Sequence, residues 1–500
     1  MVLISVLFYL ALLLVFLSVL PKSPLMKVWK GRSFIILTTC VCLVTVALCV
    51  IPMDLSPVWN GEIPKHRNQY ELMADSILQG RLYLDLPVDP QLLTMDNPYD
   101  RQARDALGVT YYWDHAFYGG KYYMYFGVVP SLLVFAPFKL LTGATLTTYH
   151  ATQLFCGLFI VGLFVLFNMM RKRWFEGMPE GMFLALCVAA SAVSTWYLAM
   201  APALYCTAIA AAICFGVWCL VCVLAALTAE EGRHRIVLLF AGALCGALTF
   251  GCRPPVGLMC GVFLPTLFFL FKHCSSKKEF AKFFFAIAIP FLLVACALMA
   301  YNYLRFDSPF EFGQSYQLTV ADQTSYSGGT VGIGGALVGS VLFMFQPKES
   351  LLDWGGLFVN VPLFILAALT LLSGKSRAHL HKTGLIPFLI AGFVAVALIG
   401  AIDTAWSPFI LERYHSDAYW IATILMFPLF GSFYQSVLES EKEGTRRKAP
   451  VVATVVAICC LLAVVVSAVY FCIPYDSNIA AYDPHFLPKV FKALTFGMLG

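Results

Sequence analysis

Long apolar runs alternate with short polar connections over most of the chain. Twelve of these runs are long enough to cross about 30 Å of hydrocarbon as a helix. They occupy residues 2–20, 33–51, 149–169, 181–200, 203–228, 236–253, 255–271, 283–303, 357–373, 384–402, 418–438 and 450–472. The pattern predicts an all-α polytopic membrane protein with about 12 transmembrane helices and a long first outer loop carrying membrane-parallel helices.

Basic residues are concentrated in alternate connections, and this pattern assigns the connections to the two sides of the membrane. Twenty of the 33 Lys and Arg residues fall in six clusters, each between alternate apolar runs. Because basic loops stay on the cytoplasmic side, this distribution predicts that both termini lie outside. Two apolar segments, 128–141 and 336–345, are too short to span and are expected to be interfacial or re-entrant pieces on the outer face.

The predicted spans divide the chain into six regions. They are two N-terminal transmembrane helices (1–51), an outer loop with interfacial helices and an aromatic hairpin (52–148), a six-helix transmembrane block (149–303), a second outer loop (304–356), a four-helix transmembrane block (357–472) and an outer C-terminal tail (473–500). We expect the functional site in the two long outer loops, because they hold most of the polar sequence.

Composition excludes a water-soluble enzyme, since 60% of residues are hydrophobic and only 12% are charged. The net charge of +5 is spread over short loops, which argues against nucleic acid as a partner. Most cysteines lie inside apolar runs, and the histidines lack metal-ligand spacing. The sequence therefore predicts no His-based metal site and no cofactor, and leaves a divalent metal requirement open.

Carboxylates are concentrated in the first outer loop, which holds ten of the 28. Within it, residues 67–80 have apolar positions at helical spacing, at Tyr70, Met73, Ala74, Ile77 and Leu78. This spacing predicts an amphipathic helix on the membrane, ending at Gly80, with Arg67, Glu71 and Asp75 on another face. The polar stripe is either solvated, with an Arg67–Glu71 ion pair, or it places Asp75 or Glu71 at the lip of a cavity.

The segment 111–126 is dominated by aromatic residues, which make up nine of its sixteen positions. A Gly119–Gly120 pair in its middle predicts a β-hairpin. One interpretation is an aromatic belt at the membrane surface. The other is a wall, including Tyr122 and Tyr123, on which a sugar or isoprenoid stacks, with Asp114 among rings that raise its pKa toward that of a useful base.

Two arginines stand at outer helix ends, where the charge bias of the chain disfavours them. Arg305 follows the eighth run, and Arg413 precedes the eleventh next to Tyr414. These side chains either contact lipid headgroups or bind an anionic group.

Four groups of residues resemble the glycosyltransferase-C superfamily, the membrane enzymes that use polyprenyl-phosphate sugars, and in particular its poorly characterised bacterial branch. The resemblance covers about residues 50–440. It is carried by Tyr70 with Ala74-Asp75, Leu78 and Gly80-Arg81-Leu82; by Gly120-Lys121-Tyr122-Tyr123 with Pro130 and Gly143; by Arg305-Phe306 with Glu311-Phe312-Gly313; and by Glu412-Arg413-Tyr414.

The resemblance implies a multi-pass protein of the plasma or inner membrane with its active site facing outside. It implies transfer of a sugar, with inversion, from a polyprenyl-phosphate donor to an envelope glycan, lipid or protein acceptor, using a carboxylate base. Fixed cations would stabilise the leaving phosphate, for which Arg305 and Arg413 are the first candidates and Lys121 the third. The candidate catalytic residues are Asp114 and Asp75, and the candidate substrate-binding residues are Arg305, Arg413, Lys121, Tyr122, Tyr123, Tyr414 and Glu71.

The identity of the base stays open at this point. Related families usually have an acidic pair before the tyrosine of the first-loop helix, where this chain has His66-Arg67, so Asp54 and Glu62 compete with Glu71, Asp75 and Asp114. Physical reasoning favours Asp114, and position within the family pattern favours Asp75. Two other classes remain: a transporter or lipid flippase, and an envelope polymer ligase or polymerase.

Overall fold

The computed structural model describes residues 6, 10, 13–55, 69–229, 232–324, 333–348, 353–406, 412–442, 448–471, 483, 485–495 and 497. In this part of the chain, ten helices are long and apolar enough to cross a membrane. They are α2 (Gly31–Val50), α7 (Thr148–Trp174), α8 (Glu180–Met200), α9 (Leu204–Thr228), α10 (Arg233–Phe250), η4 (Pro254–Val262) continued by α11 (Phe263–His273), α12 (Lys277–Phe306), α17 (Ile386–Trp406), α18 (Glu412–Lys442) and α19 (Ala449–Phe471). The protein is an integral membrane protein of the predicted all-α class.

These ten helices coincide with ten of the twelve predicted spans. The first predicted span, 2–20, lies largely outside the described residues. The prediction of a single span at 357–373 is wrong. The chain forms three short helices there, α14 (Leu357–Asn360), α15 (Leu363–Leu369) and η5 (Thr370–Leu372). Pro362 lies between the first two pieces and cannot donate a backbone hydrogen bond, which accounts for the interruption.

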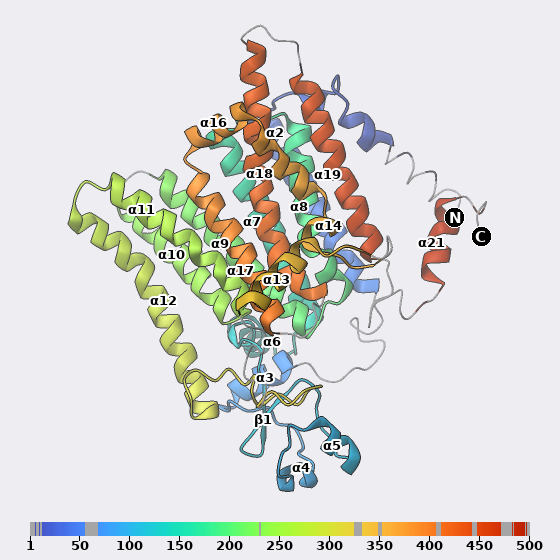
Figure 1. The fold of residues 1–500 in the computed structure, drawn as a ribbon, viewed down its shortest axis with the longest axis vertical. Helices are drawn as coiled ribbons and strands as arrows, with labels where there is room; N and C mark the ends of the chain where they lie inside the picture. Colours follow the sequence, from blue (N-terminus) through green and yellow to red (C-terminus); the bar gives the residue numbers. More distant parts are fainter. Residues whose placement is uncertain are drawn as a thin grey trace.

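The short helix α13 (Ile333–Phe345) packs against α17. A Cβ atom on Gly339 would come within 2.4 Å of Thr404, so the two helices approach closely at this glycine. Figure 1 shows α13 and α14 on the path from the outer loops toward α16 (Gly374–Thr383) at the opposite end of the bundle. Between α12 and α17, the chain therefore runs from one end of the bundle to the other through several short helices in series.

Small residues allow the long helices to pack tightly. The central helix α8 is rich in Ala and Ser and is buried on nearly all sides, as expected for a helix that is apolar all round. Gly216 of α9 lies against the buried ring of Trp420 of α18, where a Cβ atom would come within 2.5 Å of the indole. Small residues at helix contacts are typical of membrane bundles.

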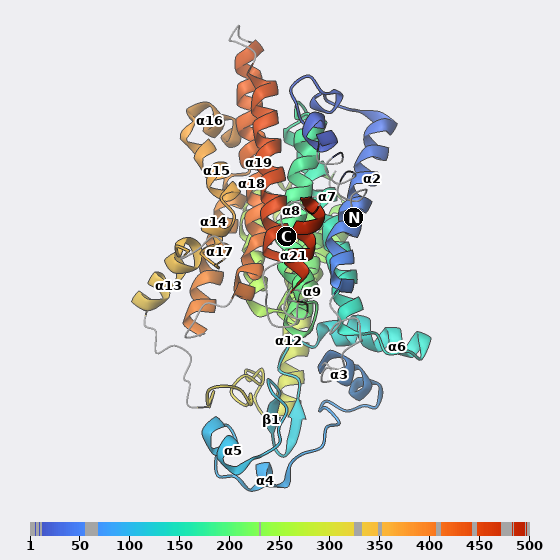
Figure 2. The same ribbon diagram turned by 90° about the vertical axis from the view of Figure 1, so that its right-hand side faces the viewer.

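The first outer loop folds into short elements at one end of the bundle (Figures 1 and 2). They are η2 (Ile51–Leu55), α3 (Gln69–Leu78), α4 (Pro90–Thr94), α5 (Arg101–Leu107), β1 (Ala116–Tyr118), β2 (Lys121–Tyr123), η3 (Ser131–Phe135) and α6 (Ala136–Thr142). Asp89 and Asp100 cap α4 and α5 by accepting hydrogen bonds from backbone N–H groups of the first turn.

The predicted hairpin and first-loop helix are both present. Strands β1 and β2 pair antiparallel with Phe117 opposite Tyr122, and Gly119 and Gly120 make the turn with φ angles of 56° and 73°. Helix α3 buries Tyr70 and Met73 and packs against η3 and α6. Helix α6 belongs to the segment 128–141, which was expected to be interfacial, and leaves Leu140 and Leu141 exposed.

The second outer loop adds a third extended segment to the hairpin. Asp114 N donates to Leu318 O at 3.0 Å, Leu318 N donates to His115 O at 2.9 Å, and Phe117 N donates to Tyr316 O at 2.8 Å. Residues 316–318 therefore lie beside β1, although about two hundred residues of chain separate them. The two loops form one layer, which we call the outer layer after its predicted side of the membrane.

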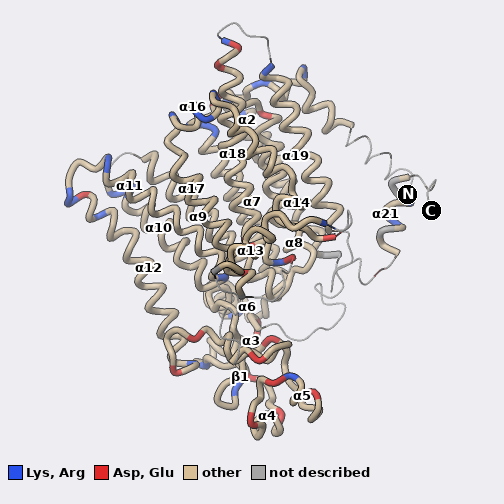
Figure 3. The backbone as a smooth tube through the Cα atoms, in the orientation of Figure 1, with Lys and Arg blue, Asp and Glu red and all other residues tan. Residues whose placement is uncertain are grey.

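Charge separates the two ends of the molecule. Figure 3 shows acidic residues gathered in the outer layer around α4, α5 and β1, and basic residues around α16 and the nearby helix ends. Two further short helices, η1 (Pro24–Met26) and α21 (Phe486–Leu494), belong to the terminal segments.

Candidate functional site

A cavity of about 910 Å³ lies where the outer layer meets the helices. Its walls come from the segment before and after the hairpin, the ends of α10, α12, α17 and α18, the start of η4, and the second outer loop. This volume falls within the range of small-molecule sites. Four of the residues singled out from the sequence line it, namely Asp114, Arg305, Arg413 and Tyr414.

Asp114 is held in a strained backbone conformation between the two outer loops. Its φ angle is 55°, in the left-handed region that non-glycine residues rarely adopt. The backbone N–H donates to Leu318 O at 3.0 Å, and the backbone carbonyl accepts a hydrogen bond from Gln69 Nε2 at 2.6 Å. A strained backbone conformation persists only where the surrounding contacts hold it in place. Such positions are common at functional sites.

The surroundings of the Asp114 carboxyl favour its neutral form. Burial raises the pKa of Asp114 above its ordinary value, while hydrogen bonds from Thr319 and Gln317 and the charge of Arg413 lower it in part. The Gln317 bond is 2.9 Å from Nε2 to Asp114 Oδ1. A buried carboxylate with a raised pKa is a stronger base than an exposed one, so Asp114 is suited to accept a proton.

Arg413 presents a cation to the cavity from the start of α18. Its guanidinium lies 3.9 Å from the ring centroid of Tyr205 and 5.5 Å from that of Tyr414. Its buried Nε has no hydrogen-bond partner among the described residues. A cation that stacks on aromatic rings and keeps unused donors is well prepared to bind an anion.

Arg305, near the end of α12, is more completely engaged. Nη1 donates to Met124 O at 2.6 Å and Nη2 donates to Asn302 Oδ1 at 2.8 Å, while the guanidinium lies 3.8 Å from the centroid of Tyr301. Its Nε is buried, and no described residue bonds to it. Arg305 therefore ties α12 to the segment after the hairpin and contributes a second positive charge.

Two charged groups of the cavity were not predicted from the sequence. Arg253, between α10 and η4, forms an ion pair with Asp417 of α18, with Nη2 to Oδ2 at 2.7 Å. Asp403 of α17 is buried beside them, and its Oδ2 has no partner within the described ranges. The available signal was an ionisable residue at the outer end of an apolar run, followed in the case of Arg253 by Pro254.

Asp75 and Glu71 lie on α3, away from the cavity walls. Asp75 forms an ion pair with Lys139 of α6. Glu71 Oε1 accepts hydrogen bonds from the N–H and hydroxyl of Thr148, each at 2.9 Å, at the start of α7. Both carboxylates thus join α3 to neighbouring helices. The side chains of Asp54 and Glu62, and the pair His66-Arg67, lie outside what the structure describes.

The hairpin strands also face away from the cavity. Tyr122 is buried against Tyr112 and Phe117, Tyr123 packs on Phe306, and the Lys121 ammonium lies 4.5 Å from the ring centroid of Tyr83. Within the 111–126 segment, the aromatic residues that line the cavity are Trp113, Tyr125 and Phe126, which lie on either side of the hairpin. Tyr122 and Tyr123 therefore do not line this cavity, and the 111–126 segment contributes to its wall through the flanks of the hairpin.

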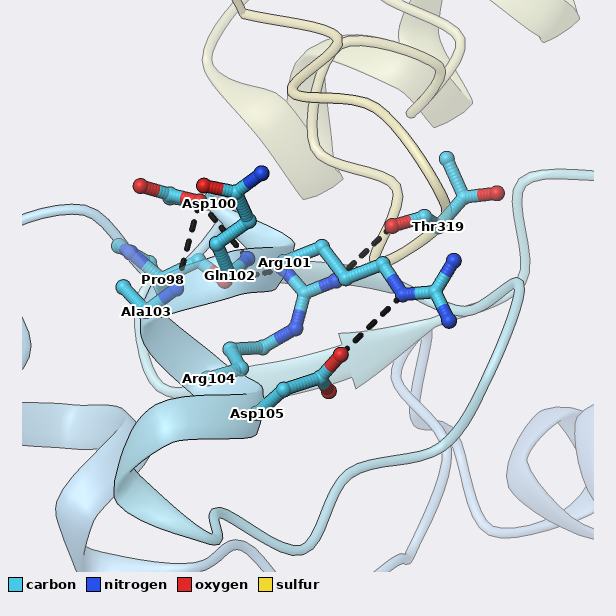
Figure 4. A network of polar contacts seen from close by, with 8 residues as sticks. All are labelled: Pro98, Asp100, Arg101, Gln102, Ala103, Arg104, Asp105 and Thr319. Carbon is cyan, nitrogen blue, oxygen red and sulfur yellow. Dashed lines mark hydrogen bonds and ion pairs between the residues drawn. The ribbon is translucent and has the colours of Figure 1, made fainter.

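Arg104 of α5 connects the outer layer to the cavity wall (Figure 4). It is fully buried, and its guanidinium donates to Pro98 O at 2.6 Å and to Thr319 O at 2.9 Å. Thr319 in turn hydrogen-bonds to Asp114. Arg104 therefore fixes the segment that supplies the donors around the Asp114 carboxyl.

No family model and no curated protein matches this chain. Among solved structures, it is similar to the archaeal oligosaccharyltransferase AglB from Archaeoglobus fulgidus, in complex with an inhibitory peptide and a dolichol-phosphate, with a TM-score of 0.49 and 11% sequence identity over 88% of this chain and 56% of that chain. It is also similar to ArnT from Cupriavidus metallidurans bound to undecaprenyl phosphate, with a TM-score of 0.41 and 12% identity over 89% of this chain and 78% of that chain.

This chain spans little more than half the length of the AglB structure. The chemistry of this chain follows from the residues of its own cavity.

Proposed function

We propose that this protein is a membrane glycosyltransferase that moves a sugar from a polyprenyl-phosphate donor to an acceptor hydroxyl. The observation that carries the proposal is a cavity lined both by a buried carboxylate, Asp114, and by the cations Arg413 and Arg305, whose Nε atoms have no partner among the described residues. A base and fixed cations in one cavity are what transfer of a sugar from a phosphate requires. The motifs shared with the glycosyltransferase-C superfamily support the same activity.

The lipid part of the donor is argued from the location of the cavity. Its helix side is lined by apolar side chains, among them Leu258, Leu298 and Ile402, and Ile402 is exposed on the side of α17. An isoprenoid chain can lie along such a surface while its phosphate reaches the arginines. We place the reaction on the outer face of the plasma or inner membrane, because the outer layer is acidic and the basic clusters lie at the other end.

In the proposed mechanism, the configuration at the anomeric carbon of the donor sugar is inverted. Asp114 accepts the proton of the acceptor hydroxyl as the hydroxyl oxygen forms a bond to the anomeric carbon of the donor sugar. The bond between that carbon and the phosphate oxygen breaks, and its electron pair stays on the phosphate. Arg413 and Arg305 stabilise the charge that develops on the departing polyprenyl phosphate. The predicted absence of a cofactor remains a prediction.

The test uses purified protein and synthetic undecaprenyl-phosphate sugars. We expect release of undecaprenyl phosphate and no turnover with nucleotide sugars, because no phosphate-cradling motif for a nucleotide occurs in the sequence. Arg413→Gln should lower turnover by roughly 10²-fold, the order of loss when one transition-state donor is removed. Turnover with a nucleotide sugar alone would contradict the proposal, and movement of intact lipid across vesicles without bond cleavage would favour a flippase.

A further inference from the structure

Gln69 connects the proposed base to the first-loop helix. It is the first residue of α3, and its side chain is fully buried. Its Nε2 donates to the backbone carbonyl of Asp114 at 2.6 Å and lies 3.4 Å from His115 Nδ1. Both contacts cross from α3 to the segment that enters β1, about 45 residues further along the chain. One amide therefore joins the two elements whose relative position places the Asp114 carboxyl.

Helix α3 is fixed to neighbouring helices by contacts that do not involve the base. Glu71 Oε1 accepts two hydrogen bonds from Thr148 at the start of α7, each at 2.9 Å. The backbone carbonyl of Tyr70 accepts a hydrogen bond from the buried hydroxyl of Ser131 in η3, at 3.0 Å. Because Gln69 directly precedes Tyr70, its side chain starts from a backbone that is held in place.

The hydrogen bonds of Asp114 come from two directions. The second outer loop accepts from its N–H through Leu318 O, at 3.0 Å, and donates to its Oδ1 through Gln317 Nε2, at 2.9 Å. Gln69 donates to its backbone carbonyl from the side of α3. The residue is thus held between the second outer loop and the first-loop helix.

The backbone conformation of Asp114 depends on such contacts. With a φ angle of 55°, it lies in a region that costs free energy for any residue with a side chain. Loss of the Gln69 bond would let the peptide after Asp114 rotate and φ return to an ordinary value. Either change would turn the carboxyl away from its present direction, and a displacement of about 1 Å at a reacting group can lower a rate about 10²-fold.

We infer that Gln69 is a positioning residue for the proposed reaction, and that it sets the direction in which Asp114 presents its carboxyl to the cavity. The inference rests on the proposed function, which makes Asp114 the base, and adds a residue that acts on this base from α3. The cavity wall includes Asp114 and does not include Gln69 among the described residues. Loss of the Gln69 amide should therefore slow the chemical step and leave donor binding unchanged.

Gln69→Met removes the amide donor at nearly constant side-chain length. With purified protein and undecaprenyl-phosphate sugars, we expect kcat for release of undecaprenyl phosphate to fall about 10- to 10²-fold, and the KM for donor to change less than about 2-fold. Gln79→Met is the matched control, because Gln79 is exposed just beyond the other end of α3, and it should keep normal kcat. A normal kcat in Gln69→Met, or a loss confined to the donor KM, would overturn the inference.

A double-mutant cycle separates positioning of the base from general support of the site. If Gln69 acts through Asp114, Gln69→Met should lower kcat by about 3-fold or less in a protein that already carries Asp114→Asn. An equal loss in both backgrounds would mean that Gln69 acts on the cavity as a whole, which contradicts the inference.

Thermal unfolding and donor binding distinguish a folding defect from misplacement of the base. Gln69→Asn, the second variant, keeps an amide that is one methylene too short for the bond, and we expect it to lose kcat while it folds and binds donor normally. If neither variant folds, Gln69 serves the folding of the outer layer and the inference is wrong. Failure of the proposed function has a different signature: the wild-type protein would release no undecaprenyl phosphate, or Asp114→Asn would keep normal turnover, and Gln69 would then have no base to position.

Discussion

Asp114 combines burial, backbone strain and directed hydrogen bonds in a single side chain. Asp114→Asn keeps its size and most of its hydrogen bonding but removes basicity, so turnover should fall by roughly 10²- to 10⁴-fold with donor binding unchanged. Asp75→Asn tests the rival carboxylate and should retain most turnover, because Asp75 is paired with Lys139 outside the cavity. Steady-state rates and donor binding of both variants check the prediction, and the opposite ranking would assign the base to α3.

The donors around Asp114 set the pH at which it works. A base must be ionised to act, so the rate should fall as the pH drops through the pKa of Asp114, which burial holds above its ordinary value. Gln317→Leu removes a donor to the carboxylate, disfavours the ionised form and should move the acid limb of the pH profile to higher pH. Gln102→Leu, on the exposed side of α5, leaves that bond in place and serves as the control. An unmoved acid limb in Gln317→Leu would mean that another group titrates.

Sequence reasoning reached Asp114 because the aromatic residues that bury it are its neighbours in the chain. It missed the pairing of Arg253 with Asp417, since these residues are 164 positions apart and nothing local to either indicates the other. It placed Tyr122 and Tyr123 on the wall of the site, although they point to opposite faces of the hairpin, where Tyr122 packs against Phe117 and Tyr123 against Phe306. Local composition indicated the region where the cavity lies, and long-range contacts decide which residues line it.

The second outer loop completes the site by pairing with β1, and Arg104 holds it there. Arg104→Met would leave the carbonyls of Pro98 and Thr319 without their donor. The Thr319 bond is buried, so its loss costs about 1–3 kcal/mol, and the loss of the partly buried Pro98 bond costs less. We expect faster proteolysis within residues 308–323 and reduced turnover, with little change in the unfolding of the helix bundle.

Arg101→Met is the matched control for Arg104→Met. Arg101 lies three residues away on the same helix and pairs with Asp105 through solvent-exposed side chains, which contribute little to stability. Limited proteolysis followed by mass spectrometry compares the two variants. Equal protection of the loop in both would mean that strand pairing alone holds it.

Hydropathy predicted helix boundaries correctly where the apolar run alone determines the helix. The prediction was wrong where tertiary packing determines where the helix ends. The apolar run 357–373 has the length of a span, but it begins where Gly356 lies against the backbone of α13, with its N–H donating to Gln346 O at 2.8 Å. A Cβ atom on Gly356 would come within 2.4 Å of Phe345 N. This close approach, together with Pro362, divides the run into short helices, and hydropathy contains no information about either contact.

The uneven division of charge between the two ends of the molecule gives a test of its orientation. Counting spans in sequence placed the six basic clusters on one side, and in the structure the basic residues lie mainly away from the acidic outer layer (Figure 3). The short helices that replace the single span predicted at 357–373 do not change the side on which each basic cluster lies. The series still connects the outer loops to α16.

Cysteine labelling in a Cys-depleted background measures the orientation directly. Ala106→Cys, on the exposed side of α5, should react with an impermeant maleimide on intact cells, because α5 belongs to the acidic outer layer. Ala378→Cys, exposed on α16 among Lys375, Arg377 and Lys382, should react only after permeabilisation, since basic loops remain on the cytoplasmic side. Labelling of Ala378→Cys in intact cells would place the cavity on the cytoplasmic side, where it could not receive an acceptor from the cell envelope.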